Sequence, residues 1–231
     1  MNKYGWIIFS VVVIGLLGGL IIWTRSTNPT ADVSKINNNS ILAATVDSGN
    51  IADNVKGNKE SKVLLVEYGD FQCPGCAAAS PYVNTLMEEY GDRVSLVFRN
   101  FPLTSIHPNA KVASAAAESA GLQGKYWEMH DFLYQNQSAW SNLDTSKRTV
   151  AFVEFASQLG LDTAKFTEDL TSPDVAKKIT FDFALGKQNS VSATPTFFLN
   201  GEKLDGTDAA EGIVQGDLTA IKVKLDKLLA E

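Results

Sequence analysis

The chain has 231 residues, 45% of them hydrophobic, which is enough for one domain with a sizeable core or for one domain with short additions. Its 26 acidic and 20 basic residues give a formal net charge of −6. This acidic balance, without a basic stripe, excludes nucleic acid as an expected partner, because a phosphate backbone needs clustered positive charge.

The first element in chain order is an apolar stretch at residues 4–24, which contains no charged side chain. As a helix with a rise of about 1.5 Å per residue, it would span the roughly 30 Å of a bilayer core. Trp6 and Trp23 lie near its two ends, as interfacial anchors do. A cleaved signal peptide is the alternative, but its apolar core is usually about 7 to 15 residues and ends in a small-residue site that is missing after Trp23. We therefore predict a single transmembrane anchor over residues 1–25.

Residues 26–50 are rich in Asn and Ser and contain no aromatic side chain. Such a segment buries little apolar surface, so we expect a flexible tether. The folded domain is then expected over residues 51–231.

A strand, a helix and a second strand open this domain. The run KVLLVEY at residues 62–68 is apolar and β-branched, which is typical of a buried strand. Apolar residues then recur with helical spacing up to Tyr90, and Gly91 ends the pattern. Residues 93–103 alternate and are aromatic, which indicates another strand. Together they predict one βαβ unit.

Alanine-rich and amphipathic segments follow from His107 to Asn189, and they predict four or five helices. Strand signals return only at residues 194–206, where Asn200-Gly201 predicts a hairpin turn. A last helix is expected over residues 219–231. This order indicates an α/β sheet domain with an inserted helical subdomain at about residues 105–189.

Cys73 and Cys76 are the only cysteines of the chain. A cysteine reacts as the thiolate, and at an ordinary pKa of about 8.5 it needs a field that favours the anion. Cys73 falls just before the helix that begins near Pro74, where free backbone N–H groups provide that field. Cys76 lies one turn further on the same face, within disulfide reach. Cys73 is thus expected to attack and Cys76 to resolve.

Other uses of the two cysteines fit less well. A zinc site needs four ligands, and beyond the cysteines the chain offers only His107 and His130, with carboxylates as weaker candidates. Haem attachment needs a histidine after the second cysteine, but position 77 is alanine. A purely structural disulfide would close almost no loop and so would stabilise little. No metal and no organic cofactor is expected.

Two further residues are candidates for the site. Glu67 precedes Cys73 by six positions on the entering strand, where it could relay protons to the resolving thiol. The alternative is a half-exposed glutamate at a strand end. Pro195 lies in SATPTFF, and the sequence alone favours a trans bond before it, since only about 5 to 6% of X-Pro bonds are cis.

The motifs EYGDFQCPGC, FRNFPL, HPNA, GKYWEMHD and TPTFFLNG occur in this order. With them the chain resembles the membrane-anchored DsbA-like thiol-disulfide oxidoreductases of bacteria, from about residue 55 to its end. The resemblance implies a thioredoxin fold with a helical insertion, in agreement with the order of elements that the periodicity predicts.

The resemblance also implies a set of site residues. In such proteins the proline before the last strands is cis, so Thr194 would present its backbone to an extended client strand, which pairs beside it. The implied catalytic residues are Cys73 as nucleophile, Cys76 as buried partner, Glu67 as buried acid and Pro195, and the implied client-binding residues are Pro74, Gly75 and Thr194.

Two positions depart from the pattern of the enteric DsbA. Gly75 stands where that protein has a histidine, so a side chain that stabilises the thiolate is missing and a milder oxidant is expected. Thr194 before the proline is also found in related isomerases and reductases, which leaves the direction of electron flow open.

We expect a thiol-disulfide oxidoreductase, held at the cell membrane by a single span, that oxidises thiols of reduced client proteins outside the cytoplasm. The resemblance implies reoxidation by a quinone-linked membrane partner. The alternatives are a disulfide reductase or isomerase of the same fold, or a non-catalytic thioredoxin-like module that binds clients.

Overall fold

The computed structural model divides into two units, residues 1–31 and 32–231, and it describes residues 31–204 and 209–231. The predicted membrane anchor over residues 1–25 lies outside the described residues. Of the helices in the described ranges, none combines the length and the apolar character that a bilayer span requires. Every strand and helix of the described ranges belongs to the second unit.

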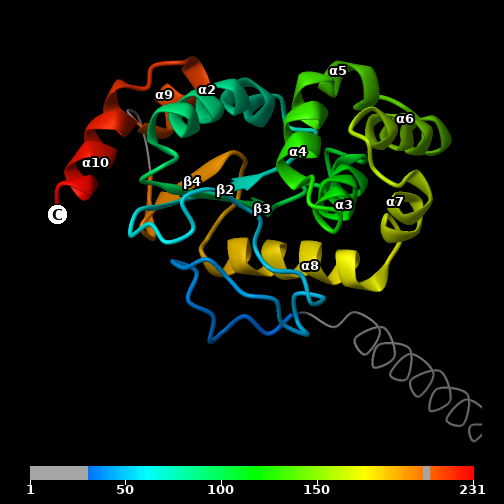
Figure 1. The fold of residues 1–231 in the computed structure, drawn as a ribbon, viewed down its shortest axis with the longest axis horizontal. Coiled ribbons are helices and arrows are strands. Elements are labelled where there is room, and N and C mark those ends of the chain that lie inside the picture. Colours follow the sequence, from blue (N-terminus) through cyan, green and yellow to red (C-terminus); the bar gives the residue numbers. More distant parts are fainter. Residues whose placement is uncertain (1–30, 205–208) are drawn as a thin grey trace, which may run out of the picture. The chain divides into compact units, whose positions relative to one another are not determined.

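The described residues of this unit form one five-stranded mixed sheet (Figure 1). In order across the sheet, the strands are β1 (Val55–Gly57), β3 (Ser95–Asn100), β2 (Leu64–Gly69), β4 (Thr196–Leu199) and β5 (Glu202–Lys203). Only β2 and β3 are parallel, and the other three pairs are antiparallel. The central strand β2 is buried along its whole length, which agrees with its mainly apolar sequence, in which Glu67 is the one charged residue.

The predicted βαβ unit is confirmed. Helix α2 (Pro74–Tyr90) connects β2 to the parallel strand β3. It begins with proline at its first position, where the missing N–H costs no hydrogen bond, and its backbone N–H ladder ends at Gly91. The short strand β1, at the sheet edge, was not predicted.

Six helices lie in the described stretch between β3 and β4: α3 (Ala110–Gly121), α4 (Tyr126–Gln135), α5 (Gln137–Trp140), α6 (Thr145–Gln158), α7 (Thr163–Asp169) and α8 (Pro173–Gln188). The side chains of Asp144, Asp162 and Ser172 accept backbone hydrogen bonds at the starts of α6, α7 and α8. These caps fix where the helices begin.

The C-terminal part begins with the predicted hairpin. Asn200 and Gly201 join β4 to β5 with φ of 47° and 82°, as a tight turn of this kind requires. Helices α9 (Ala209–Gln215) and α10 (Thr219–Leu229) follow. The sequence predicted α10 but not α9.

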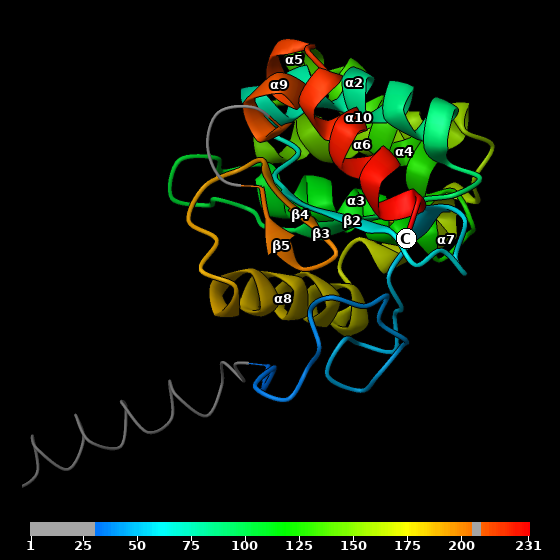
Figure 2. The same cartoon turned by 90° about the vertical axis from the view of Figure 1, so that its left-hand side faces the viewer.

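Two helical layers enclose the sheet (Figures 1 and 2). Helices α2, α9 and α10 cover one face and share an apolar cluster with β2, β3 and β4. Helix α8 lies along the other face and packs against β3. The C-terminal part of the predicted insertion at about residues 105–189 is therefore a layer of the sheet domain.

A second apolar cluster fills the helical block. It is built from α3, α4, α6 and the chain around them, and it includes Phe71, Cys73, Cys76 and Phe98. Helix α3 contributes mainly alanines, whose small side chains allow its neighbours to pack closely. The two cysteines thus lie where the insertion core meets the end of the central strand.

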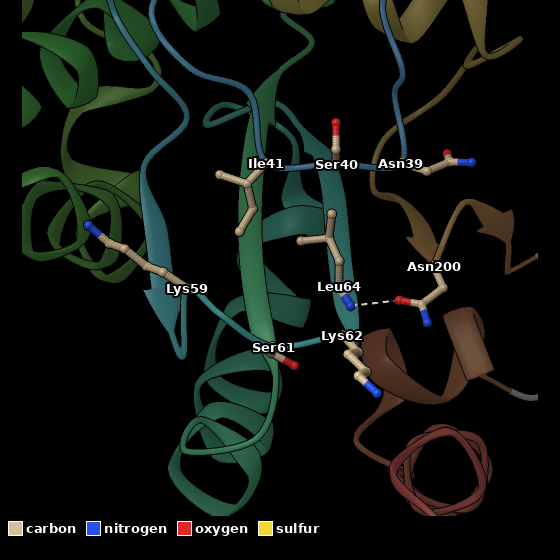
Figure 3. A pocket seen from close by; sticks show the side chains of 8 residues that line it. All are labelled: Asn39, Ser40, Ile41, Lys59, Ser61, Lys62, Leu64 and Asn200. Atoms are coloured by element: carbon tan, nitrogen blue, oxygen red, sulfur yellow. Dashed lines mark hydrogen bonds between the residues drawn. The ribbon is translucent and has the colours of Figure 1, made fainter. Parts of the chain in front are cut away.

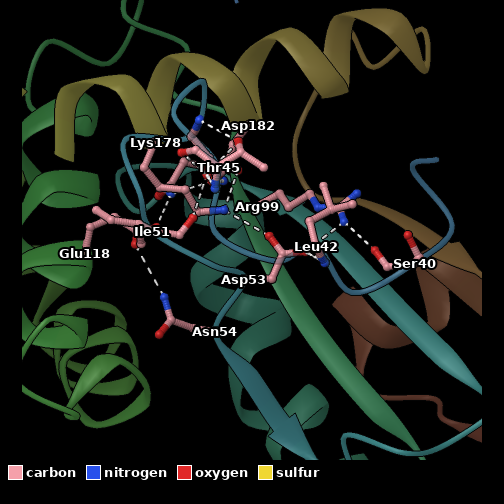
Figure 4. A network of polar contacts seen from close by, with 12 residues as sticks. Ser40, Leu42, Thr45, Ile51, Asp53, Asn54, Arg99, Glu118, Lys178 and Asp182 are labelled. Carbon is pink, nitrogen blue, oxygen red and sulfur yellow. Dashed lines mark hydrogen bonds and ion pairs between the residues drawn. The ribbon is translucent and has the colours of Figure 1, made fainter. Parts of the chain in front are cut away.

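The chain before β1 contains no helix or strand from residue 32 to residue 54, yet it contacts the domain closely. The fully buried guanidinium of Arg99 donates to the carbonyl oxygens of Asn38 and Ser40 at 2.9 Å each. It also pairs with Asp53 at 2.8 Å, and Asp53 pairs with Lys178 of α8 at 2.9 Å (Figure 4). The described part of the segment expected to be a flexible tether is thus packed on the domain.

Candidate active site

Cys73 is the N-cap residue of α2, so its sulfur lies at the end of the helix where backbone N–H groups are free. Both thiols are free and unlinked. Cys73 keeps 8% of its surface exposed, whereas Cys76 is fully buried. Of the pair, only Cys73 can be reached from solvent, as expected for an attacking and a resolving thiol.

The pKa of the Cys73 thiol is lowered to about 5. The largest cause is a hydrogen bond from the Cys76 side chain, and the Thr194 side chain and the backbone N–H groups of Cys76 and Gly75 add to it, against the opposing effect of burial. Cys73 is therefore a thiolate at neutral pH, as the helix-start argument predicted.

The pKa of Cys76 is raised well above its usual value. Burial is the main cause, and the hydrogen bond that Cys76 donates to Cys73 and the negative charges of Glu67 and Cys73 act in the same direction. One thiol is thus held ionised and the other protonated. This division of states suits a nucleophile and a resolving partner.

Glu67 lies in the central strand, opposite Phe98 of β3 and Phe197 of β4. Its side chain is buried and Oε1 has no hydrogen-bond partner. Burial, followed by the charge of Cys73, raises the pKa of Glu67 to about 8, so the carboxyl group is mostly protonated at neutral pH. The alternative of a half-exposed strand end is excluded.

The loop before β4 faces the dithiol. The Thr194-Pro195 peptide bond is cis, as the resemblance predicted and the sequence alone did not. In its thiol form Cys73 donates to the carbonyl oxygen of Thr194 across 3.3 Å. A Cβ atom added to Gly75 would lie 3.3 Å from Cδ of Pro195 and 3.7 Å from Sγ of Cys73. Pro74, Gly75, Thr194 and Pro195 therefore surround the sulfur from both sides.

Side chains that sequence reasoning did not single out hold the cysteine loop between β2 and α2. Nε2 of Gln137 donates to the carbonyl oxygens of Phe71 and Cys73 at 2.8 and 3.0 Å. The buried carboxylate of Asp70 accepts from the N–H of Leu103 at 2.8 Å and lies 2.7 Å from Nδ1 of His107. Their positions follow from contacts between distant segments, which no local spacing reveals.

Aromatic side chains surround the buried side of the dithiol. Phe71 packs against Phe98 and Tyr134 with ring centroids 4.9 and 5.0 Å apart, and His130 lies 4.9 Å from Phe98. The described residues contain no cluster of His, Cys, Asp and Glu able to hold a metal ion.

A separate pocket of about 370 Å³ lies at the other end of β2, where that strand begins (Figure 3). Its lining residues are Asn39, Ser40, Ile41, Lys59, Ser61, Lys62, Leu64 and Asn200. None of the candidate site residues belongs to it. This pocket is distinct from the dithiol site.

A mixed sheet, a two-cysteine motif at the start of the helix that follows its central strand, and a facing cis-proline loop define a thioredoxin-fold protein with a dithiol site. The sequence profile of the family described as Thioredoxin matches residues 49–215. The chain belongs to this family.

Solved structures agree with this assignment. A thioredoxin-like oxidoreductase from Silicibacter pomeroyi DSS-3 is 26% identical, with a TM-score of 0.62 over 81% of this chain and 99% of that one. The thiol-disulfide exchange protein alpha-DsbA2 from Wolbachia pipientis is 19% identical, with a TM-score of 0.63 over 76% and 87%. At 19% identity, the similarity to alpha-DsbA2 shows a shared fold only. The predicted resemblance to DsbA-like proteins is confirmed.

A curated relative carries a different name. The Na(+)/H(+) antiporter NhaA 1 of Salinispora arenicola (strain CNS-205) is 40% identical over 161 residues, which are 70% of this chain and 24% of that protein. The chain thus spans about a quarter of the length of this relative. The antiporter name describes the whole of that longer protein.

Proposed function

We propose that this chain is a thiol-disulfide oxidoreductase that oxidises pairs of thiols in client proteins outside the cytoplasm. The observation that carries the proposal is the position of Cys73 at the start of α2, stabilised by Cys76 and facing the cis-proline loop. A low pKa of the attacking cysteine means that the reduced form is stabilised as the thiolate. The disulfide of such a site is therefore a stronger oxidant.

The reaction begins with the Cys73–Cys76 disulfide. A client thiolate attacks Sγ of Cys73, so a client–Cys73 bond forms, the bond to Cys76 breaks, and Cys76 leaves as a thiolate. Because the pKa of Cys76 is raised, this thiolate takes up a proton. Glu67, protonated at neutral pH and buried beside the pair, supplies it.

The second client thiolate then attacks the client sulfur of the mixed disulfide. A disulfide forms within the client, and Cys73 leaves as a thiolate, which its pKa of about 5 favours. The proton of the client thiol restores Glu67 to its protonated state. In sum, two electrons pass from the client dithiol to the Cys73–Cys76 pair.

The backbone around Thr194 is the proposed docking edge for the client. An extended client segment pairs with this backbone beside the mixed disulfide, as strands add to exposed edges in other complexes. Gly75 has no side chain, and this allows the start of α2 to approach Pro195 closely, since a Cβ atom there would lie 3.3 Å from Cδ of the proline.

Location and redox partner complete the proposal. The uncharged stretch at residues 4–24 supports a single-pass anchor at the cell membrane. An oxidising compartment is required, because cytosolic glutathione would keep the dithiol reduced. A membrane protein linked to quinones then accepts the two electrons and restores the disulfide.

The test is equilibration of the full chain with glutathione buffers, followed through the free thiols of Cys73 and Cys76. A reduction potential toward the oxidising end of the known range, about −120 mV, supports an oxidase. A value toward about −270 mV indicates the reductase alternative instead. If a Cys73→Ser chain keeps its effect on client folding, the chain is a binding module and the proposal is overturned.

A further inference from the structure

A pocket of about 490 Å³ lies next to the dithiol, between the β3–α3 loop, the α5–α6 loop and the start of α6. Ten residues line this pocket, which we call the Arg148 pocket: Gln72, Ile106, Pro108, Asn109, Ser141, Asn142, Leu143, Asp144, Thr145 and Arg148. Gln72 directly precedes Cys73 in the sequence, so one wall of the pocket belongs to the cysteine loop.

Arg148 is a buried cation in this pocket, with 7% of its surface exposed. Among the described residues, the only acceptor for its side chain is Oδ1 of Asn109, which takes a hydrogen bond from Nη1. Nε is sealed from solvent and has no hydrogen-bond partner. Because Nε is sealed, a ligand in the pocket can reach only Nη2, for which the described residues provide no acceptor, and Nη2 can donate to a carboxylate oxygen.

No carboxylate of the described residues pairs with Arg148. The nearest candidate along the chain is Asp144, which also lines the pocket. Its carboxylate caps α6 and lies 3.3 Å from Nζ of Lys147 instead. Burial lowers the pKa of Arg148, and no ion pair opposes that effect. A buried cation without a counter-ion is unusual, since buried charges in proteins are normally paired.

The pocket walls are held in place from the cysteine loop. Nε2 of Gln72 donates to the carbonyl oxygen of Ser141 at 2.7 Å, and its Oε1 accepts from the N–H of Asn109 at 2.7 Å. Asn109 in turn donates to the carbonyl oxygens of Ser141 and Leu143 at 2.9 Å each. Asn109 thus joins the cysteine loop to Arg148 through a network of hydrogen bonds.

One wall of the pocket is apolar and open to solvent. Ile106 is 67% exposed, and Pro108 lines the pocket two residues further on. An occupant therefore meets a cation and an apolar surface together. A polypeptide with an acidic residue beside an apolar one has this chemistry.

We propose that the Arg148 pocket binds an aspartate or glutamate side chain of the client, close in sequence to the client's reacting cysteine. The proposal rests on the proposed oxidoreductase function and specifies its substrate class: clients with an acidic residue near the cysteine are preferred. The carboxylate supplies the counter-ion that Arg148 lacks. Because the client is then held beside Cys73 before exchange, the preference is expressed in KM.

The test uses the full chain and a set of dithiol peptides, each with one glutamate placed at a different position within a few residues of the first cysteine. Each peptide is paired with its glutamine counterpart. At the best position we expect the glutamate peptide to have a KM about tenfold lower, which corresponds to about 1.4 kcal/mol. Arg148→Gln equalises the two KM values, and high salt reduces the difference.

Two further variants separate binding from folding. Lys111→Gln removes the same charge from an exposed position of α3 outside the pocket lining, and it must leave the glutamate preference intact. Arg148→Glu must reverse the preference toward a lysine peptide, a result that a misfolded protein cannot give. Equal KM values for glutamate and glutamine peptides at every position overturn the proposal.

Two further measurements distinguish a failure of the pocket proposal from a failure of the proposed oxidoreductase function: turnover of an uncharged disulfide, and direct binding of a peptide. Turnover of bis(2-hydroxyethyl) disulfide, with dithiothreitol as the reductant that restores the Cys73–Cys76 dithiol, tests the dithiol without the pocket, because neither compound carries a charge. Binding is followed on the Nε–H resonance of Arg148 while a cysteine-free glutamate peptide is added. A shift with the glutamate peptide and none with the glutamine peptide supports the pocket even if turnover fails, and identical spectra overturn it.

Discussion

Sγ of Cys73 lies 3.3 Å from the carbonyl oxygen of Thr194, a residue 121 positions further along the chain. The pairing of β2 with β4 explains this contact. Tyr68 of β2 lies opposite Thr196 of β4, so the end of β2 that leads to the cysteines meets the start of β4. The site is therefore built across two antiparallel neighbours, and the whole helical block lies between them in sequence.

Thr194→Val should make the protein a weaker oxidant. The buried hydroxyl of Thr194 has no hydrogen-bond partner among the described residues while Cys73 donates its own proton to the Thr194 carbonyl, so this hydroxyl is free to donate to the Cys73 thiolate and lower the pKa of Cys73. Valine keeps the shape of threonine without this donor. A rise of about one pKa unit corresponds to about 1.4 kcal/mol, or a reduction potential about 30 mV more negative. Equilibration with glutathione measures it. An unchanged potential would show that the hydroxyl has no part in holding the thiolate.

The rate at which iodoacetamide alkylates Cys73 is proportional to the fraction of thiolate. Plotted against pH, this rate should have its midpoint near pH 5. Because the hydrogen bond from Cys76 is the largest cause of the lowered pKa, Cys76→Ala should move the midpoint upward. Cys76→Ser keeps a donor at the same place and serves as the matched control. If the wild-type midpoint were close to that of an ordinary free cysteine, the environment at the start of α2 would not stabilise the Cys73 thiolate.

Glu67→Gln should change how stability depends on pH. The pKa of Glu67 is raised from 4.5 to about 8 in the folded protein, so its stabilising contribution is complete below pH 4.5 and is lost as pH rises to about 8. The unfolding free energy of the reduced wild type, minus that of the variant, should fall by about 1.4 kcal/mol per pH unit in this window.

Urea unfolding at several pH values measures this difference. The unfolding free energy of the variant is subtracted from that of the wild type, and this cancels the contribution of Cys73. That contribution increases with pH, opposite to that of Glu67, because the pKa of Cys73 is lowered in the folded protein. Glu88→Gln changes an exposed glutamate of α2 and is the control. A difference that does not vary with pH would mean that Glu67 is ionised in the fold.

Asp53→Ala should destabilise the domain by about 3 to 5 kcal/mol, because it leaves the buried cations Arg99 and Lys178 without this shared counter-ion. Asp47→Ala changes an exposed aspartate of the same segment and should have little effect. Denaturant midpoints of the two variants provide the comparison. Equal midpoints would show that the segment before β1 does not contribute to the stability of the domain.

The sequence predicted the elements that carry a strong local pattern. The buried run of β2, the helix after the cysteines and the Asn200-Gly201 hairpin all follow from periodicity and turn chemistry. Strand β1 is only three residues long and half polar, so it has no such pattern, and α9 is a short helix. Local signals fail where pairing with a distant strand or helix decides the structure.

Only the part of the site that is local in sequence could be predicted. Cys73, Cys76 and the start of α2 are local in sequence, and their roles follow from helix chemistry. The cis bond before Pro195 required the family resemblance, because composition favours trans. Arg148 gave no signal, since its lack of a carboxylate partner is visible only once the chain is folded.

The lowered pKa of Cys73 has a consequence for the protein itself. The folded dithiol is stabilised by an ionic state that the unfolded dithiol lacks at neutral pH, and the disulfide form has no thiolate to stabilise. A thermodynamic cycle then requires that closing the bond between Cys73 and Cys76 weakens the fold relative to the dithiol state. In the proposed reaction, each transfer of a disulfide to a client would leave a more stable molecule behind, and this gain in folding free energy would favour the oxidation of the client.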